Sequence, residues 1–265
     1  MGGDHSETMH IAILGLGEAG SHFANDLAQL GITVTGYDPA PKRALHEAVV
    51  LKNSNAEAVL GADIILSVNL SAVAEAVALE VASVLQPGQF YAEMNTASPD
   101  TKRAVGAIIE PPGALAVDVA IMAPVPPKGI QTPFLVSGPG ANRFAEKLFP
   151  LGLDITVLSD EMGEAATRKL LRSIVYKGIA AVIGEAVAAG QSFGLEPYIR
   201  EQIGSVIGGN DPDVGRDLID RFLEGSKTHA LRRSHELEAV VEMLEARSVE
   251  AVMSRATLTS LKNLI

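Results

Sequence analysis

The stretch Ile11–Gly20, with the sequence IAILGLGEAG, decides the fold of this chain. It opens on four apolar residues, which is typical of a buried parallel strand that breaks into a turn. Gly15, Gly17 and Gly20 then give the spacing G-x-G-x-x-G. Glycines at this spacing serve a tight turn, close approach of a pyrophosphate to the backbone, and close packing of a helix on the strand. The stretch therefore predicts a dinucleotide-binding turn; a similar turn that binds no ligand is the alternative.

The residues that follow favour a dinucleotide site. A helix is expected over 19–30, and its free N–H groups and positive dipole end would face the phosphates. A second strand, Ile32–Tyr37, ends at Asp38, where a carboxylate can bond both hydroxyls of an adenosine ribose. Because this carboxylate would repel the 2′-phosphate of NADP, we expect NAD to be preferred. Lys42 and Arg43, a few residues on, could reach such a phosphate and weaken the preference.

Strands and helices alternate through the first half of the chain. This alternation predicts an α/β fold with a doubly wound, mostly parallel Rossmann sheet that binds ligands at the carboxyl ends of its strands. A short exposed helix is expected over 39–49, and Ser98 with Pro99 should begin another helix. Further strands are expected at Val49–Leu51, Asp63–Val68, Phe90–Met94, Ala114–Ala120, Phe134–Ser137 and Ile155–Leu158. The candidate cofactor-binding residues are Gly15, Leu16, Gly17, Glu18, Ala19, Gly20, Asp38, Ser67, Val68, Asn69, Asn95 and Thr96.

Only helical periodicity is found beyond residue 160. The sequence therefore predicts two domains, a dinucleotide-binding domain over 1–160 and an all-helical domain over 161–265 that serves substrate binding and dimerisation. A long helix, Glu161–Phe193, should join them, and later helices should begin at Asp211-Pro212 and cover 227–246 and 248–263. The segment Gly178–Gly190 is apolar around its circumference and has glycines at 178, 184 and 190, so we expect a homodimer in which a partner subunit buries it.

Composition excludes several classes of function. The formal net charge of −11 argues against nucleic acid and anionic membranes as partners, since both call for clustered Lys and Arg. The absence of cysteine excludes disulfides, thiolate zinc sites and a thiol nucleophile, and no metal site is expected. No secretion signal is recognised, and no uninterrupted apolar run reaches membrane-spanning length, so we expect a cytoplasmic protein.

A polar stripe lies on the first half of the long predicted helix. Its residues fall at i, i+3, i+4, i+7 and i+8, which places them on one face. They are Lys169, Arg172, Ser173, Tyr176 and Lys177. A solvated face is the simpler interpretation. The alternative is a catalytic one, because an amine held near other cations and partly desolvated loses its proton more easily, which suits general acid–base chemistry.

Three segments together resemble the β-hydroxyacid dehydrogenase superfamily, which includes 6-phosphogluconate and 3-hydroxyisobutyrate dehydrogenases. They are GLGEAG with Asp38, the loop Asn95–Pro99, and GEAATRK at Gly163–Lys169. The resemblance spans almost the whole chain. It implies a Rossmann domain followed by a helical domain, with Lys169 as the general acid/base. It also implies that the backbone around Thr96 positions the substrate or the nicotinamide ribose.

The chain departs from the family pattern in its substrate-binding segments. The family loop Asp-Ala-Pro-Val-Ser-Gly-Gly is replaced by Asp118–Pro124, so that Met122 stands for the substrate-binding serine. Ser173 likewise replaces an asparagine. These departures resemble a divergent branch with a phosphogluconate-dehydrogenase-like helical C-terminal domain. In the phosphogluconate relatives, Arg and His of this domain hold the anionic end of the substrate, which makes His229, Arg232 and Arg233 candidates here, with His235 nearby. A solvated helix with ordinary charge pairs is the alternative.

The resemblance implies an NAD(P)-dependent oxidoreductase. It would move hydride between nicotinamide and the alcohol or carbonyl carbon of a small polar, acidic substrate. Loss of the serine and the asparagine leaves open the reduction of an imine, and the phosphogluconate relatives leave open an oxidative decarboxylation. A protein that binds NAD(P) without turnover is the alternative from another class, and an amine at position 169 argues against it.

Overall fold

The structure, a computed structural model, describes residues 9–208 and 212–265. The chain divides into two compact units, of which the first ends at Lys169 and the second comprises Leu170–Ile265. This division falls inside a helix, nine residues beyond the domain boundary expected from the sequence.

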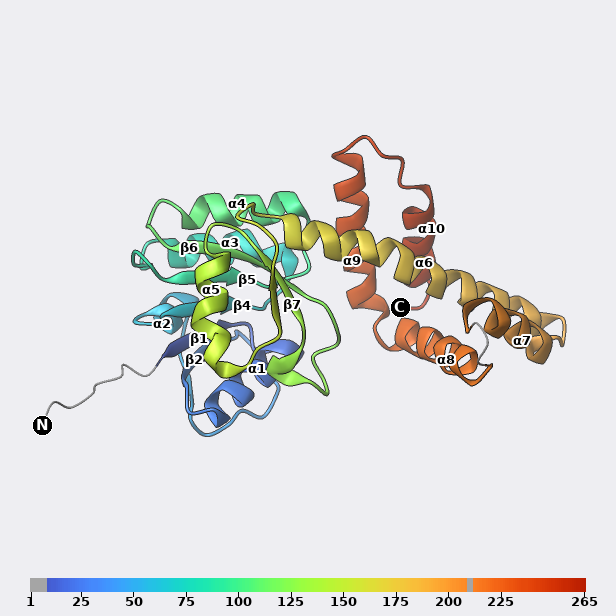
Figure 1. The fold of residues 1–265 in the computed structure, drawn as a ribbon, viewed down its shortest axis with the longest axis horizontal. Coiled ribbons are helices and arrows are strands. Elements are labelled where there is room, and N and C mark those ends of the chain that lie inside the picture. The colour runs from blue at the N-terminus through green and yellow to red at the C-terminus, as the bar shows by residue number, and fades with distance from the viewer. Residues whose placement is uncertain (1–8, 209–211) are drawn as a thin grey trace, which may run out of the picture. The chain divides into compact units, whose positions relative to one another are not determined.

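The first unit is built on an eight-stranded sheet with the order β3-β2-β1-β4-β5-β6-β7-β8 (Figure 1). Neighbouring strands are parallel except for β6 and β7, so the predicted doubly wound, mostly parallel sheet is confirmed. The strands are β1 (His10–Leu14), β2 (Thr33–Tyr37), β3 (Val49–Leu51), β4 (Ile64–Ser67), β5 (Phe90–Glu93), β6 (Leu115–Ile121), β7 (Phe134–Ser137) and β8 (Ile155–Val157).

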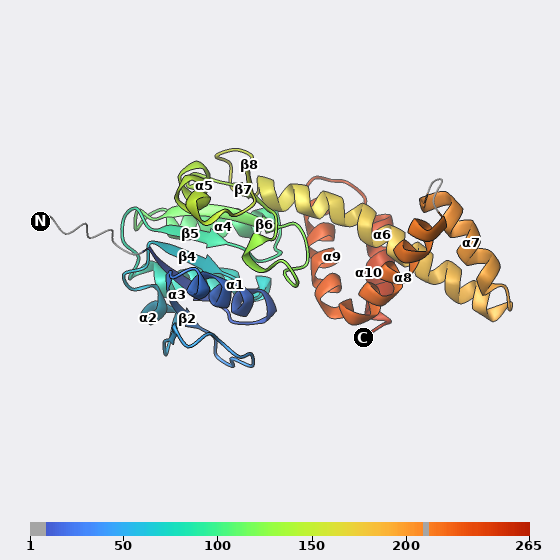
Figure 2. The same cartoon turned by 60° about the horizontal axis from the view of Figure 1, so that its bottom comes forward.

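Helices cover both faces of this sheet (Figures 1 and 2). They are α1 (Glu18–Gln29), α2 (Asn55–Val59), α3 (Ala74–Ala82), α4 (Pro99–Ile109) and α5 (Ala141–Leu148), with short 3-10 turns η1 (Ser71–Val73), η2 (Gly129–Gln131) and η3 (Phe149–Leu151). Helix α5 was not expected from the sequence. The predicted start of α4 is confirmed, because Ser98 accepts a hydrogen bond from the Thr101 N–H and Pro99 is the first helical residue.

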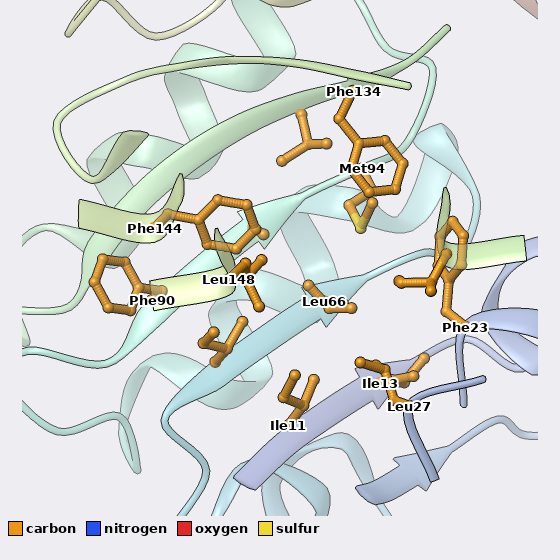
Figure 3. Packing of buried hydrophobic residues seen from close by; sticks show 14 of the residues in the cluster. Ile11, Ile13, Phe23, Leu27, Leu66, Phe90, Met94, Phe134, Phe144 and Leu148 are labelled. Atoms are coloured by element: carbon orange, nitrogen blue, oxygen red, sulfur yellow. The ribbon is translucent and has the colours of Figure 1, made fainter. Parts of the chain in front are cut away.

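The core of the first unit lies on both faces of the sheet. Ile11 and Ile13 of β1 point toward α1 and α5, whereas Ala12 and Leu14 point toward α2, α3 and α4. Figure 3 shows the first of these clusters, in which side chains from α1 and α5 close over the strands. Burial of each large aliphatic side chain contributes about 1.5–3 kcal/mol, so this core holds the strand ends in fixed register.

The helix expected over 39–49 is wrong. The segment between β2 and β3 is irregular, and the side chain of Asn25 on α1 ties it down. Asn25 Nδ2 donates to the Ala44 carbonyl at 3.3 Å, and its Oδ1 accepts from the His46 N–H at 2.7 Å. Pro41 disfavours the helical conformation of Ala40 before it, and the bonds to Asn25 take the place of helical ones.

The described part of the second unit is helical. Helix α6 (Glu164–Ser192) begins in the first unit and continues into the second, followed by α7 (Glu196–Ile207), α8 (Pro212–Thr228), α9 (Ala230–Glu245) and α10 (Val252–Lys262). Helix α7 packs against α8, and α9 packs against α10 (Figure 1). The helix expected over 227–246 is divided at His229, which has non-helical dihedral angles. The expected N-cap Asp211 lies outside the described residues.

Helix α6 is apolar and only partly covered by its own chain. Its 29 residues are long and apolar enough to cross a membrane, a test that the core helices of soluble proteins also pass. One third of its most apolar window is buried. Val175, Ile179 and Val182 are exposed along one side of this helix, so the chain itself does not bury the full circumference.

Candidate active site

The glycine turn between β1 and α1 has the geometry that a dinucleotide requires. Gly15 has a φ of +98°, and a Cβ there would lie 2.6 Å from the Val68 carbonyl oxygen. A Cβ on Gly20 would lie 1.9 Å from the Gly15 carbonyl oxygen, so this glycine permits the helix to pack on the turn. The Cβ position of Gly17 faces open space, which leaves room for a phosphate against the backbone. The residues present therefore fit a dinucleotide at the N-terminus of α1.

Asp38 lies where the adenosine ribose of such a cofactor is expected. Its Oδ2 accepts from the Leu16 N–H at 2.8 Å, and its Oδ1 accepts from the Ala40 N–H at 2.8 Å. These bonds fix the carboxylate beside the glycine turn, and each oxygen keeps a second lone pair for a hydroxyl donor. On the exposed side of the turn, Arg43 forms an ion pair with Glu18 at 3.7 Å.

The ends of β4 and β5 continue the site. The glycine turn packs on Val68 and Asn69, which follow β4. Asn69 Nδ2 donates to Ser67 Oγ at 3.1 Å, and Asn69 Oδ1 accepts from Asn95 Nδ2 at 2.9 Å. Ser67 is itself fully buried, so its side chain orients Asn69 rather than facing a ligand. The predicted cofactor residues at three strand ends are thereby brought together.

Lys169 joins this group from the start of α6. Its Nζ donates to Thr96 Oγ1 at 2.7 Å, directly after Asn95. Gly163, with a φ of +93°, allows the approach, since a Cβ there would lie 2.9 Å from the Pro99 carbonyl oxygen at the start of α4. The predicted catalytic lysine therefore lies at the carboxyl end of β5, in the same unit as the glycine turn.

In the second unit the polar stripe is only partly solvated, since Arg172 is exposed whereas Ser173 and Lys177 are buried. Lys177 Nζ lies 2.6 Å from Glu236 Oε1 on α9 and donates to Ser173 Oγ at 3.2 Å. Ser173 also donates to Glu236, and both Ser173 and Lys177 are buried. Burial lowers the pKa of Lys177, with the carboxylate of Glu236 opposing the shift and Arg233 and Arg232 adding to it.

Tyr176 is the centre of a second cluster in this unit. Its ring packs edge-on against Phe222 of α8 at 5.0 Å between centroids. The guanidinium groups of Arg172 and Arg233 lie 6.0 and 5.9 Å from the Tyr176 ring centre. Arg233 Nη1 also donates to Ser226 Oγ at 2.9 Å. The cluster thus contains Arg172 and Arg233, two of the three predicted substrate-binding arginines. The third, Arg232, is exposed, and the predicted residue His229 lies directly before α9.

The predicted substrate loop begins later than the sequence suggests. Residues 118–121 belong to β6, paired with β7, and only Met122 and the residues after it leave the sheet. Met122 is partly buried, and its N–H donates to the Pro133 carbonyl at 2.9 Å. Asp118 is therefore an interior strand residue and not part of a loop.

Sequence reasoning missed a buried charged group in the first unit. Glu93, Lys102 and Asp118 lie together with no more than 1% of any of them exposed. A signal was available, because FYAE and LAVDVAI each carry a single acid in an otherwise apolar strand. A charge at such a position is costly unless it is paired.

The fold and the turn define a Rossmann-type dinucleotide-binding protein with a helical C-terminal domain. Residues 10–138 match the family described as the NAD binding domain of 6-phosphogluconate dehydrogenase. Residues 191–264 match a domain of unknown function, DUF1932. These two matches agree with the resemblance to the β-hydroxyacid dehydrogenase-like superfamily that the sequence motifs indicated.

Similar proteins agree with this assignment. An uncharacterised 28.5 kDa protein of Methanothermus fervidus is 26% identical over 97% of this chain and 99% of its own. A probable 3-hydroxyisobutyrate dehydrogenase of Mycobacterium tuberculosis is 28% identical over 70% of this chain and 65% of its own. The solved M. tuberculosis 3-hydroxyisobutyrate dehydrogenase with L-serine has a TM-score of 0.78 at 22% identity, covering 97% of this chain and 93% of that one, which shows a shared fold.

Proposed function

We propose that this protein is an NAD(P)-dependent dehydrogenase or reductase that acts on the alcohol or carbonyl carbon of a small polar acid. The observation that carries the proposal is the contact between Lys169 Nζ and Thr96 Oγ1 at the carboxyl end of β5. A scaffold that merely holds a dinucleotide has no use for an amine at this place. The family match supports a nicotinamide cofactor.

The glycine turn and Asp38 would hold the pyrophosphate and the adenosine ribose. A nicotinamide held there would supply the hydride acceptor for oxidation of an alcohol carbon, or the hydride donor for reduction of a carbonyl carbon. Lys169 supplies the other half of the reaction. Its neutral amine takes the hydroxyl proton in oxidation, and its ammonium returns that proton in reduction. Thr96 holds Nζ by accepting its hydrogen bond, which directs the remaining N–H groups of the amine.

We propose that cationic side chains of the second unit hold an anionic group of the substrate. Arg172 is the first choice, because it lies on α6 three residues beyond Lys169 and is exposed. Ser173 and Lys177 are less suited to direct contact, since both are buried against Glu236. Small hydroxy acids are the substrate class that we test first, and the 3-hydroxyisobutyrate dehydrogenase relatives support that choice.

We also propose a homodimer formed through the exposed apolar side of α6. A cavity of about 550 Å³ lies between α6 and α7 and is lined almost wholly by aliphatic side chains, with Val175, Val182 and Val206 at its exposed rim. An aliphatic surface of this kind is suited to a second copy of the chain. The symmetric self-association of α6 and α7 would bury it.

The test is a panel assay read at the nicotinamide absorbance. Wild-type protein is mixed with NADH or NADPH and a panel of oxo acids, aldehydes and imines, and with NAD or NADP and a panel of hydroxy acids that includes 3-hydroxyisobutyrate and L-serine. A hydroxy acid or oxo acid as the best substrate supports the proposal. An imine as the best substrate would replace it with imine reduction. Release of carbon dioxide would indicate an oxidative decarboxylase.

With a substrate identified, Lys169→Met tests the proton transfer. This change keeps the length and the apolar stem but removes the transferable proton, so kcat should fall by ~10²–10⁴-fold. Arg172→Ala is the comparison, and it should raise KM more than it lowers kcat, because it removes binding that ground state and transition state share. A Lys169→Met variant with near-normal kcat contradicts the proposal.

A further inference from the structure

Three charged side chains in the interior of the first unit take no part in the steps above. Glu93 and Asp118 are register partners on β5 and β6, so both emerge on the face of the sheet that α4 covers. Lys102 comes from α4, and its Nζ lies 3.1 Å from Glu93 Oε2 and 3.2 Å from Asp118 Oδ1. It also donates to the Glu93 carbonyl oxygen at 2.7 Å. We call these three residues the buried triad.

Stability alone is a poor reason for the buried triad. Removing charges from water has a large free-energy cost, and apolar side chains of the same volume often stabilise the folded protein as well or better. Burial acts to lower the pKa of Lys102, but the two carboxylates outweigh it and raise that pKa. The ammonium therefore stays charged in the interior, where its hydrogen bonds are directional and strong. What the buried triad offers is fixed geometry.

One arm of the buried triad fixes the residue before Thr96. Glu93 Oε2 accepts from the Asn95 N–H at 2.9 Å, and Glu93 Oε1 accepts from Asn95 Nδ2 at 2.6 Å. Asn95 is thus held by both its backbone and its side chain. Because Thr96 follows directly, the position of its hydroxyl depends on Glu93.

The other arm fixes the first turn of α6. Asp118 Oδ2 accepts from the Ala166 N–H at 3.0 Å and from Ser137 Oγ at 3.3 Å, and Ser137 Oγ accepts from the Ala165 N–H at 3.1 Å. A carboxylate at a helix N-terminus is favoured by the free N–H groups and the dipole there. Lys169 lies three residues beyond Ala166, within the next turn.

We propose that Lys102, acting through Glu93 and Asp118, is the positioning residue that sets Lys169 against Thr96. The two ends of the Lys169–Thr96 contact come from separate segments, the loop after β5 and the first turns of α6. The buried triad touches both segments, and Lys102 is the charge that joins its two carboxylates. The inference rests on the proposed acid–base role of Lys169, but the contact itself can be tested without it.

The experiment compares Lys102→Met with Val105→Ala. Methionine keeps the length and apolar stem of Lys102 and removes its charge. Val105 is fully buried one turn further along α4, so its truncation destabilises the same helix without touching a charge. Thermal midpoints show whether the two losses of stability are comparable. Each protein is assayed for kcat and KM with the substrate found by the panel, and for NADH affinity by fluorescence.

A second readout is independent of turnover. Surface amines are labelled with trinitrobenzenesulfonate, and the rate at Lys169 is followed by mass spectrometry of its peptide. Lys102→Met should label several-fold faster at Lys169, because the amine is released from Thr96. It should also lower kcat by about 10–10²-fold, because displacing a catalytic group by ~1 Å reduces kcat by a factor of this size. KM and NADH affinity should stay within about twofold of the wild-type values. Val105→Ala should change neither.

The outcomes separate the positioning claim from the proposed function. Equal kcat and equal labelling in Lys102→Met and Val105→Ala overturn the positioning claim. Faster labelling in Lys102→Met, together with an active Lys169→Met variant, supports the positioning claim and refutes the acid–base role of Lys169. If Lys102→Met does not fold, Glu93→Gln replaces it, because it keeps shape and one acceptor while removing the charge. Unchanged labelling and kcat in that variant also overturn the claim.

Discussion

Lys169 and Thr96 are 73 residues apart in the sequence, yet Lys169 Nζ donates a hydrogen bond to Thr96 Oγ1 at 2.7 Å. The lysine comes from the first turns of α6 and the threonine from the loop after β5. The Asn69–Asn95 hydrogen bond connects this pair to the glycine turn. An amine and a dinucleotide-binding turn are thus held within one unit.

Thr96→Val should lower kcat by about tenfold or more. Valine keeps the shape of threonine and removes the acceptor for Lys169 Nζ, and a hydrogen bond to a charged group contributes about 1.5–3 kcal/mol. Thr96→Ser keeps the hydroxyl and should stay within a few-fold of wild type. Steady-state kinetics on the substrate identified by the panel measure both. Equal activity of the valine and serine variants would mean that the hydroxyl has no such role.

Asp38→Ser should narrow the preference for NADH over NADPH. The carboxylate of Asp38 is fixed beside the glycine turn by the Leu16 and Ala40 N–H groups, so it would meet a 2′-phosphate at close range. Fluorescence titration of wild type and variant with both reduced cofactors measures the change. Tighter binding of NADPH than of NADH by the wild type would contradict the prediction. It would indicate that Arg43, which pairs with Glu18 at the glycine turn, binds the 2′-phosphate.

Lys177→Met should remove a pH-dependent part of the stability. Burial lowers the pKa of Lys177 from its ordinary 10.5, against the opposing effect of Glu236. Between the lowered value and 10.5 the unfolded chain binds more protons than the folded one, so the unfolding free energy rises with pH in that window. Urea unfolding at several alkaline pH values should show that the unfolding free energy of wild type rises with pH relative to that of Lys177→Met. Lys147→Met, at a half-exposed ion pair, is the control. If the difference in unfolding free energy between wild type and Lys177→Met stays constant or falls as the pH rises, the prediction is wrong.

Val182→Glu should weaken the proposed homodimer. Val182 is exposed on the apolar side of α6, and a carboxylate there would be buried without a partner in an interface of two copies. Gly184 is less suitable, because its Cβ position faces Leu223 of α8 in the same chain. Light scattering at micromolar concentration measures the change, with Leu79→Glu on the surface of the first unit as the control. A monomeric wild type would refute the dimer.

Much of the fold follows from local patterns. Apolar runs separated by helical segments predict the parallel sheet, because neither face of such a strand is left to water. The segment 39–49 was misassigned because its structure depends on Asn25, a side chain 19 residues or more away in sequence. A hydrogen bond between residues so far apart does not change the hydrophobic periodicity of the segment, so the sequence pattern does not indicate it. Helix α5 is short and follows Gly138-Pro139-Gly140, which suggests a turn.

The site was predictable where chemistry follows from spacing. Gly15, Gly17 and Gly20, with the strand and helix around them, indicate a dinucleotide-binding turn by their spacing. The role proposed for Lys169 came instead from the resemblance of Gly163–Lys169 to the family. The contact of Lys169 with Thr96 was not predictable, because it depends on where the first turns of α6 lie against the loop after β5. The burial of Ser173 and Lys177 against Glu236 was missed for the same kind of reason: spacing places residues on a face but does not say what covers that face.

The division of the chain inside α6 has a consequence for how such proteins diversify. Lys169 is the last residue of the first unit, and the helix continues through Leu170 without a break. The nucleotide-binding turn and the proposed proton donor are therefore inherited on one segment, while Arg172 and every later candidate for recognising substrate lie on another. An exchange of sequence after residue 169 would replace the candidate anion-binding side chains of the second unit and leave the glycine turn and Lys169 in place.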